Sequence, residues 1–131
     1  IDDTYNANPE SLSVAIDVLA MADGEIWLVL GDMGELGAAA AEMHRGAGRR
    51  ARVAGIDRLF TLGELAGKAV EGFGGGIASH SQAELFEALQ ADLHQGVHIL
   101  VKGSRRMRME QVVEMLGAGA PSTSGETEAR H

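Results

Sequence analysis

Eight consecutive residues near the start of the chain combine side chains that suit a nucleoside site. The run reads Asp2-Asp3-Thr4-Tyr5-Asn6-Ala7-Asn8-Pro9 and stands directly before an amphipathic helical pattern. A carboxylate can accept hydrogen bonds from ribose hydroxyls, an amide can pair with a base edge, and an aromatic ring can stack on the base. The simpler interpretation is that Asn8 caps a helix whose first residue is Pro9. That interpretation leaves Tyr5, Asn6 and the two acids unexplained, so both stay open.

A second group of polar residues lies in the loop Gly31–Gly37, which reads Gly-Asp-Met-Gly-Glu-Leu-Gly. Its three glycines fit a plain strand-to-helix turn, in which Asp32 would accept hydrogen bonds from local backbone amides. The loop also follows a buried strand, where open α/β sheets bind ligands. Asp32 and Glu35 are therefore candidate ligand contacts. His44, in the next helix, lies on a face of small residues, which favours a packed, hydrogen-bonded side chain over a catalytic one.

A third group is basic: four of the chain's 11 Lys and Arg residues fall between Lys102 and Arg108. We expect a helix to begin at Arg105 with Ser104 as its cap. The helix dipole disfavours cations there by ~0.3–1 kcal/mol each. Such a cluster indicates an anion, a carboxylate or a phosphate, bound by helix amides and a guanidinium. Alternatively, the basic residues offset surplus acids, which suits Arg106 and Arg108; Lys102 and Arg105 are the better candidates.

Composition excludes several classes of function. A net charge of -8 argues against general nucleic-acid binding. The absence of cysteine excludes disulfides, thiolate zinc sites and a cysteine nucleophile. No apolar run approaches the ~20 residues of a membrane span. No Walker-type or dinucleotide-binding glycine motif follows a strand, and the glycine-rich stretch 72–76 precedes one, at the wrong end of a sheet for phosphate.

The elements that must position these groups alternate along the chain. Hydrophobic spacing and capping residues predict helices at 9–22, 38–54, 64–71, 82–93 and 105–116, and apolar runs predict strands at 25–30, 58–62, 77–80 and 97–101. This alternation predicts an α/β sandwich with a mostly parallel sheet and helices on both faces, although it does not determine the strand order. Gly31–Gly37 and Lys102–Ser104 would lie at the carboxyl ends of strands. We expect one domain over 1–117 and a disordered, apolar-poor tail over 118–131.

Together, the three motifs resemble the C-terminal domain of the Mur ligases, in the right order and spacing over about residues 2–116. The resemblance implies a Rossmann-like fold and a three-domain cytoplasmic enzyme of peptidoglycan synthesis. In the most similar member, ATP phosphorylates UDP-N-acetylmuramoyl-tripeptide, and the amine of D-alanyl-D-alanine attacks the acyl phosphate. The P-loop, the Mg²⁺ ligands and a carbamylated lysine would lie in a central domain. Since the chain begins with Ile, we expect a fragment. Because the resemblance implies that these groups belong to the missing central domain, we expect the fragment to be inactive alone, with no catalytic residue and no metal ligand.

The resemblance also implies which residues meet the ligands. Along the adenosine side of ATP it places Asp3, Tyr5, Asn6, Asn8 and Pro9. Near the incoming dipeptide and the phosphoryl end it places Lys102, Ser104 and Arg105, with Asp32 and Glu35 lining the closed cleft. Arg106 and Arg108 depart from the family's usual small residues, so no role follows for them. The implied partners are the small-molecule substrates and the other two domains, with no nucleic acid and no membrane insertion.

Two other classes of function remain open. One is a stand-alone nucleotide or anion sensor that binds a ligand without chemistry. The other is a scaffold domain in which all three motifs are turns, so that replacing Asn6 or Lys102 would change only stability.

Overall fold

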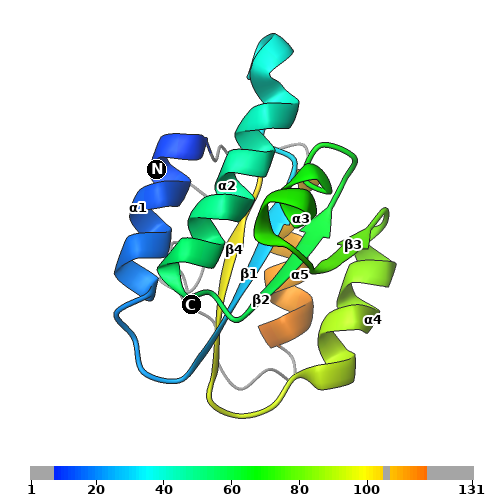
Figure 1. Cartoon of the computed structure of the whole chain (residues 1–131). Helices are drawn as coiled ribbons and strands as arrows, with labels where there is room; N and C mark the ends of the chain where they lie inside the picture. Colours follow the sequence, from blue (N-terminus) through cyan, green and yellow to red (C-terminus); the bar gives the residue numbers. More distant parts are fainter. Residues whose placement is uncertain (1–7, 105–106, 118–131) are drawn as a thin grey trace.

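The computed structural model describes residues 8–104 and 107–117, which form four strands and the helices around them (Figure 1). In chain order the elements are α1 Pro9–Leu19, β1 Glu25–Gly31, the 3₁₀ turn η2 Gly37–Ala39, α2 Ala40–Ala54, β2 Arg58–Leu62, α3 Lys68–Phe73, β3 Ile77–Ser79, α4 Gln82–Asp92, β4 Val97–Lys102 and α5 Met109–Gly117. All strand pairs are parallel, and the strand order is β3-β2-β1-β4. The predicted α/β class with a parallel sheet is confirmed.

Strand β1 lies inside the sheet because nearly every one of its residues is apolar and buried. It pairs with β2 on one side and with β4 on the other, so that Leu28 stands between Leu59 and Leu100. A strand covered on both faces needs apolar residues at successive positions, not only at alternate ones. That requirement explains the run Ile-Trp-Leu-Val-Leu within β1.

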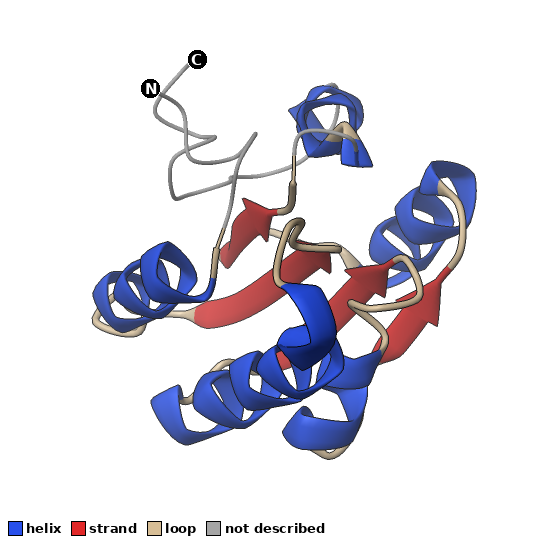
Figure 2. Cartoon of the chain, turned by 90° about the horizontal axis from the view of Figure 1, so that it is seen from above, coloured by secondary structure: helices blue, strands red, loops and turns tan. Residues whose placement is uncertain are grey.

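Helices cover both faces of the sheet (Figure 2). On one face, α1, α2 and α3 pack against Ile26, Leu28 and Leu30 of β1. On the other face, α4 and α5 pack against Trp27 and Val29. The alternation of side chains along a strand divides the core into these two clusters. The arrangement is the predicted three-layer sandwich.

Helices α2 and α3 approach each other at backbone contact. A Cβ added to Gly48 would lie 2.0 Å from the carbonyl oxygen of Ala69, and one added to Gly72 would lie 1.9 Å from that of Arg45. Around this contact, the hydrogen bond from Arg49 lowers the pKa of Glu42, and the hydrogen bond from Arg45 lowers the pKa of Glu71. Two glycines thus set the distance between these helices, and surface ion pairs surround the contact.

Most element boundaries agree with the prediction. Helix α1 begins at Pro9 behind the cap Asn8, Ser81 caps α4 through the Glu84 amide at 3.1 Å, and Gly55 ends α2 in the left-handed conformation. Helix α3 was predicted to begin at position 64, but it begins at Lys68 and is preceded by a turn. None of the described helices is long and apolar enough to cross a membrane.

The predicted start of the last helix is wrong. Helix α5 begins at Met109, not at Arg105, and Ser104 does not cap it. Arg108 adopts φ 52°, which interrupts a right-handed helix, and the Gln82 amide donates to the carbonyls of Met107 at 3.3 Å and Arg108 at 3.1 Å. The dipole of α5 therefore does not start at the basic cluster, so the expected repulsion between the dipole and these cations is not evidence for a bound anion.

Candidate functional site

The strand order creates a topological switch point between β1 and β4. From β1 the chain moves to β2 and β3 on one side, then returns to β4 on the other side. In open α/β sheets, the crevice outside the carboxyl ends of two such strands is the usual ligand site. Leu30 pairs with Lys102, so the loop after β1 and the loop after β4 begin side by side. Two of the three motifs from the sequence meet here.

The two loops touch through their backbones. The Ser104 amide donates to the carbonyl oxygen of Asp32 at 2.8 Å. A Cβ added to Gly103 would lie 3.2 Å from the Cα of Gly31, and one added to Gly34 would lie 3.5 Å from the Cβ of Ser104. The glycines of both motifs let the loops pack this closely.

Asp32 is buried, and its carboxylate supports a neighbouring loop. Oδ1 accepts a hydrogen bond from the Ala66 amide at 2.6 Å. The same carboxylate lies against Gly63, where an added Cβ would be 2.4 Å from Oδ1 and where φ is 113°. Asp32 thus fixes the loop after β2 to the loop after β1, which is the structural interpretation of this residue.

His44 is fully buried and has a hydrogen-bonding partner at each ring nitrogen. Nε2 accepts from the Met33 amide at 2.9 Å, and Nδ1 lies 2.7 Å from the carbonyl oxygen of Ala40. These partners assign the tautomer that carries its proton on Nδ1. The prediction of a packed, hydrogen-bonded side chain is confirmed, and the helix α2 is thereby joined to the loop after β1.

Glu35 differs from Asp32 because it is exposed, at the rim of the loop. Its φ of 60° lies in the left-handed region, which costs a residue other than glycine about 1–2 kcal/mol. Asp32 and Glu35, predicted as one pair of acids, therefore stand in different environments: one is engaged in the interior and the other faces solvent.

Lys102 and Ser104 are both buried at the end of β4. Val101 packs against α4 and α5, so the alternation of the strand places Lys102 on the face that carries α1 and α2. Within residues 8–104 and 107–117, the Ser104 hydroxyl oxygen has no hydrogen-bond partner. A buried hydroxyl without a partner costs about 1–3 kcal/mol, and such groups are found at functional sites.

Asn8 and Pro9 form the start of α1. The Asn8 side chain accepts from the Ser11 amide at 2.9 Å, and the Ser11 hydroxyl accepts from the Asn8 amide at 3.4 Å. The capping interpretation is thus confirmed for these two residues. Four other predicted site residues lie outside the described ranges: Asp3, Tyr5, Asn6 and Arg105.

Two features near the carboxyl ends of the strands were not predicted from the sequence. One is the loop after β2, whose Ala66 amide binds Asp32. The other is Thr61, a fully buried residue whose hydroxyl has no partner in the described part of the chain. A polar residue inside the apolar strand Arg58–Leu62 was the available signal. Among the described residues, no three His, Asp or Glu side chains gather in a way that would bind a metal ion.

Known proteins resemble both the sequence and the fold. The model of the family "Mur ligase, glutamate ligase domain" matches residues 1–105. UDP-N-acetylmuramoyl-tripeptide–D-alanyl-D-alanine ligase of Escherichia coli (strain K12) is 40% identical over 118 residues, which cover 88% of this chain and 26% of the relative. The ligase of the same name from Bacillus subtilis (strain 168) is 36% identical over 124 residues, with coverages of 88% and 27%.

Two solved structures have a fold similar to that of this chain. MurF from Acinetobacter baumannii has a TM-score of 0.76 at 37% identity and covers 88% of this chain and 27% of its own. MurF ligase from Thermotoga maritima in complex with ADP has a TM-score of 0.75 at 28% identity, with coverages of 100% and 29%. The chain spans about a quarter of the length of the curated relatives it matches. The resemblance drawn from the three motifs is therefore confirmed: this chain belongs to the Mur ligase family and carries its glutamate ligase domain.

Proposed function

We propose that this chain is the C-terminal domain of a cytoplasmic, ATP-dependent ligase of peptidoglycan synthesis. The ligase would join D-alanyl-D-alanine to UDP-N-acetylmuramoyl-tripeptide. The observation that carries the proposal is the 40% identity, over 118 residues, to the E. coli ligase of that name. The domain would extend over residues 1–117, with 118–131 as a tail outside it. Because the chain contains no P-loop motif, other domains of the full enzyme would supply the phosphate-binding loop and the Mg²⁺ ligands.

The proposed substrate edge is the switch point between β1 and β4. Support comes from the contact of the two loops, in which the Ser104 amide binds the Asp32 carbonyl. The Asp32 carboxylate binds Ala66, so we assign Asp32 a positioning role for the loop and assign the solvent-facing contact to Glu35. The Ser104 hydroxyl, which no described residue satisfies, would bind an oxygen of the ligand once the domains close.

Orientation of the incoming dipeptide is the proposed contribution of this edge. Lys102 and Arg105 would bind the dipeptide carboxylate and hold its amine against the acyl phosphate. Alignment of this kind contributes several kcal/mol to a reaction between two bound molecules. Since α5 begins only at Met109, the side chains and loop amides, not the dipole of α5, would attract the carboxylate.

The adenosine side of ATP is assigned to the first motif. Asp3, Tyr5 and Asn6 would contact the nucleoside, while Asn8 caps α1 and Pro9 is its first residue. The relative from Thermotoga maritima was solved in complex with ADP, which agrees with nucleotide binding in this family.

A domain exchange tests the proposal. Residues 1–117 replace the matching C-terminal region of the E. coli ligase, and ADP release is measured with UDP-tripeptide, with and without D-alanyl-D-alanine. The control is the E. coli domain rejoined at the same junction. We expect dipeptide-dependent ADP release from the chimera; a folded chimera without such release, beside an active control, would contradict the assignment.

The rival proposal, a nucleotide sensor without catalysis, makes a different prediction for the chain alone. Calorimetric titration with ATP should show micromolar binding for a sensor. A detached ligase domain should bind ATP weakly or not at all, because most phosphate contacts would lie in another domain.

A further inference from the structure

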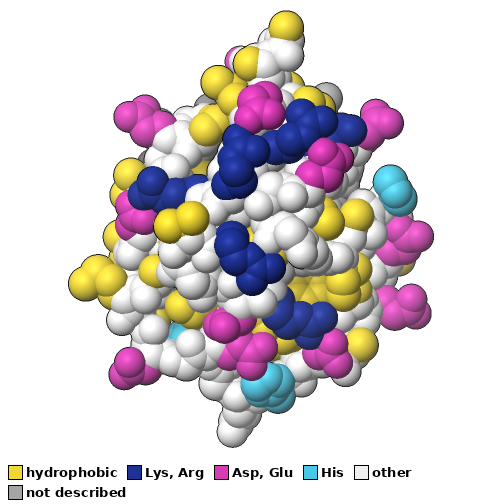
Figure 3. All heavy atoms as spheres, viewed as in Figure 1, with side chains coloured by type: hydrophobic (Ala, Val, Ile, Leu, Met, Phe, Trp, Pro, Cys, Tyr) yellow, Lys and Arg dark blue, Asp and Glu magenta, His cyan; other side chains and the backbone are white. Residues whose placement is uncertain are grey.

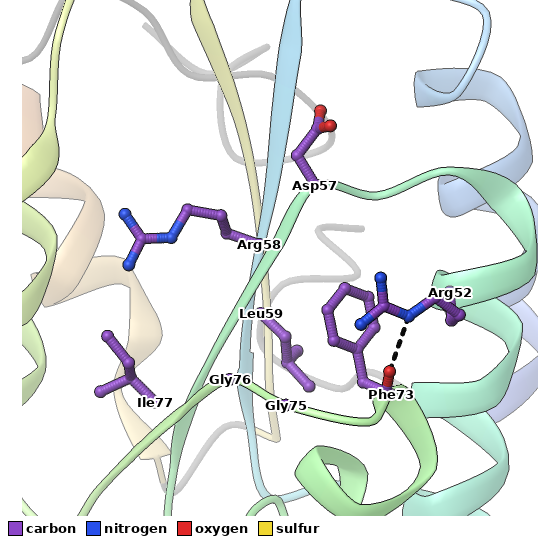
Figure 4. Close-up of a pocket in the computed structure, with 8 residues that line it drawn as sticks. All are labelled: Arg52, Asp57, Arg58, Leu59, Phe73, Gly75, Gly76 and Ile77. Carbon is purple, nitrogen blue, oxygen red and sulfur yellow. Dashed lines mark hydrogen bonds between the residues drawn. The ribbon is translucent and has the colours of Figure 1, made fainter.

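A hollow lies at the end of the sheet opposite the switch point, beside the amino ends of β2 and β3. Its volume is about 250 Å³, and Arg52, Arg58, Leu59, Phe73 and the stretch Gly75–Ile77 contribute to its lining (Figure 4). We call it the amino-edge pocket. It is separate from the switch point. The pocket lies at the amino ends of β2 and β3, whereas the proposed substrate site lies at the carboxyl ends of β1 and β4.

Arg52 is held in place at one side of the pocket. Its guanidinium stacks on the Phe73 ring, 4.1 Å from the centroid, and Nε donates to the Phe73 carbonyl at 2.7 Å. These contacts leave the two terminal nitrogens of the fork available. Within residues 8–104 and 107–117, no carboxylate forms an ion pair with Arg52. The other arginines of the same helix differ, since Arg45, Arg49 and Arg50 are all paired with acids.

Arg58 is held on the other side. Its guanidinium lies over the rings of Trp27 and Phe60, at 5.1 and 4.9 Å from their centroids, and Nη1 binds Asp92 at 2.6 Å. Asp57 also borders the pocket, but its Oδ2 accepts from the Ile26 amide at 2.8 Å, and its carboxylate points away from Arg52 in Figure 4. Arg52 and Arg58 both border the hollow, but their guanidinium groups extend to opposite sides of β2 in Figure 4, and that of Arg58 is engaged by Asp92.

The floor of the pocket is apolar, and its mouth is open. Leu59 and Phe73 are buried beneath it, and Ile77 is 37% exposed at its border. Gly75 and Gly76 have φ values of 156° and 128°, and a Cβ on Gly76 would lie 2.9 Å from the Leu59 carbonyl oxygen. A side chain at Gly76 would therefore clash with β2, and the φ of Gly75 is one that residues with side chains rarely adopt. On the face that carries α1, α2 and α3, Lys and Arg side chains lie beside Asp and Glu side chains as well as apolar ones (Figure 3).

We propose that the amino-edge pocket binds a small organic oxyanion, a carboxylate or a phosphate carried on an apolar body. A guanidinium fork binds two oxygens of one such group, and Arg52 loses little freedom on binding because it is already stacked. The apolar floor would cover the body of the ligand. The volume lies below the ~300–1,000 Å³ of common ligand pockets, so the ligand is small. The ligase proposal is not required for this inference.

Amide NMR titration of the 131-residue chain tests it. The probes are benzoate and phenyl phosphate, with benzamide as the neutral match of benzoate, and the signals followed are those of Gly75, Gly76 and Ile77. We expect saturable shifts at these amides with a Kd below about 10 mM for one or both anions, and at least fivefold weaker binding of benzamide. The stronger of the two anions identifies the charged group.

Matched variants connect the binding to the side chains. Arg52→Gln should weaken binding at least tenfold, and Arg52→Lys, which keeps the charge but not the two-nitrogen fork, gives an independent second measurement should the first variant fold poorly. Arg50→Gln, which removes a paired arginine of the same helix, should leave the Kd within twofold. Shifts that do not saturate, equal binding of benzamide, or equal Kd values for the folded Arg52 and Arg50 variants would overturn the proposal.

Discussion

Replacing His44 with Ala should destabilise the domain by about 3–5 kcal/mol. The buried Met33 amide would lose its acceptor, which costs about 1–3 kcal/mol. Removal of a fully buried ring would leave a cavity that costs on the order of 2–3 kcal/mol, toward the lower end of large-to-alanine replacements. The better helix propensity of Ala would return less than about 0.7 kcal/mol. The loss is a large part of the ~5–15 kcal/mol that stabilises a typical domain.

Urea unfolding followed by tryptophan fluorescence measures this loss, because Trp27 is the single tryptophan of the chain and is fully buried. His80→Ala is the control, since His80 is exposed, and it should stay within about 0.5 kcal/mol of the parent. His44→Gln should fall between the two, because its amide oxygen can still accept from Met33. In His44→Ala, hydrogen exchange should also quicken at the amides of Met33 and Ser104.

Two results would refute the reasoning. A free energy of unfolding for His44→Ala within about 0.5 kcal/mol of the parent would show that the imidazole does not stabilise the domain. Equal losses for the Ala and Gln variants, with unchanged exchange at Met33, would show that packing alone matters and that His44 does not hold the loop.

Three further predictions concern other parts of the molecule. Gly48→Ala should destabilise by at least about 2 kcal/mol in thermal unfolding, because the new methyl group meets the Ala69 carbonyl, whereas Gly46→Ala should be neutral or stabilising; a neutral Gly48 variant would contradict the backbone contact. The lowered pKa of Glu71 means that its ion pair stabilises above the usual value of 4.5 and is lost as pH falls through the folded pKa; Glu71→Gln should flatten this acid-side slope, and an unchanged slope would exclude the pair. If the proposed full-length ligase is correct, Lys102→Ala should reduce its dipeptide-dependent ADP release at least tenfold, and Lys102→Met should not restore it; normal rates for a folded Ala variant would contradict the role proposed for Lys102.

Local sequence predicted the elements whose causes are local. Strand Arg58–Leu62 was predicted with its observed bounds, because a short apolar run between turns permits few alternatives. Helix α1 begins where Asn8 and Pro9 direct it, since the cap and the fixed φ of proline act within one turn. The burial of His44 followed from the small residues around it.

Contacts between distant residues could not be predicted in this way. The start of α5 depends on Gln82, which binds the carbonyls of Met107 and Arg108 from another helix. Asp32 binds an amide 34 positions away, so a carboxylate that suited a ligand is engaged by the protein itself. The strand order, and with it the switch point, depends on which long-range pairs form and not on the pattern of any single strand.

The position of β1 inside the sheet has a consequence for biosynthesis. Its second neighbour, β4, ends at Lys102, 71 residues after β1 ends at Gly31 (102 − 31 = 71). Until that segment leaves the ribosome, one full row of β1 backbone amides and carbonyls has no partner strand, on a segment of almost uninterrupted apolar residues. Unpaired apolar edges template aggregation. A nascent chain stalled before position 97 should therefore depend on chaperones far more than one released after position 102.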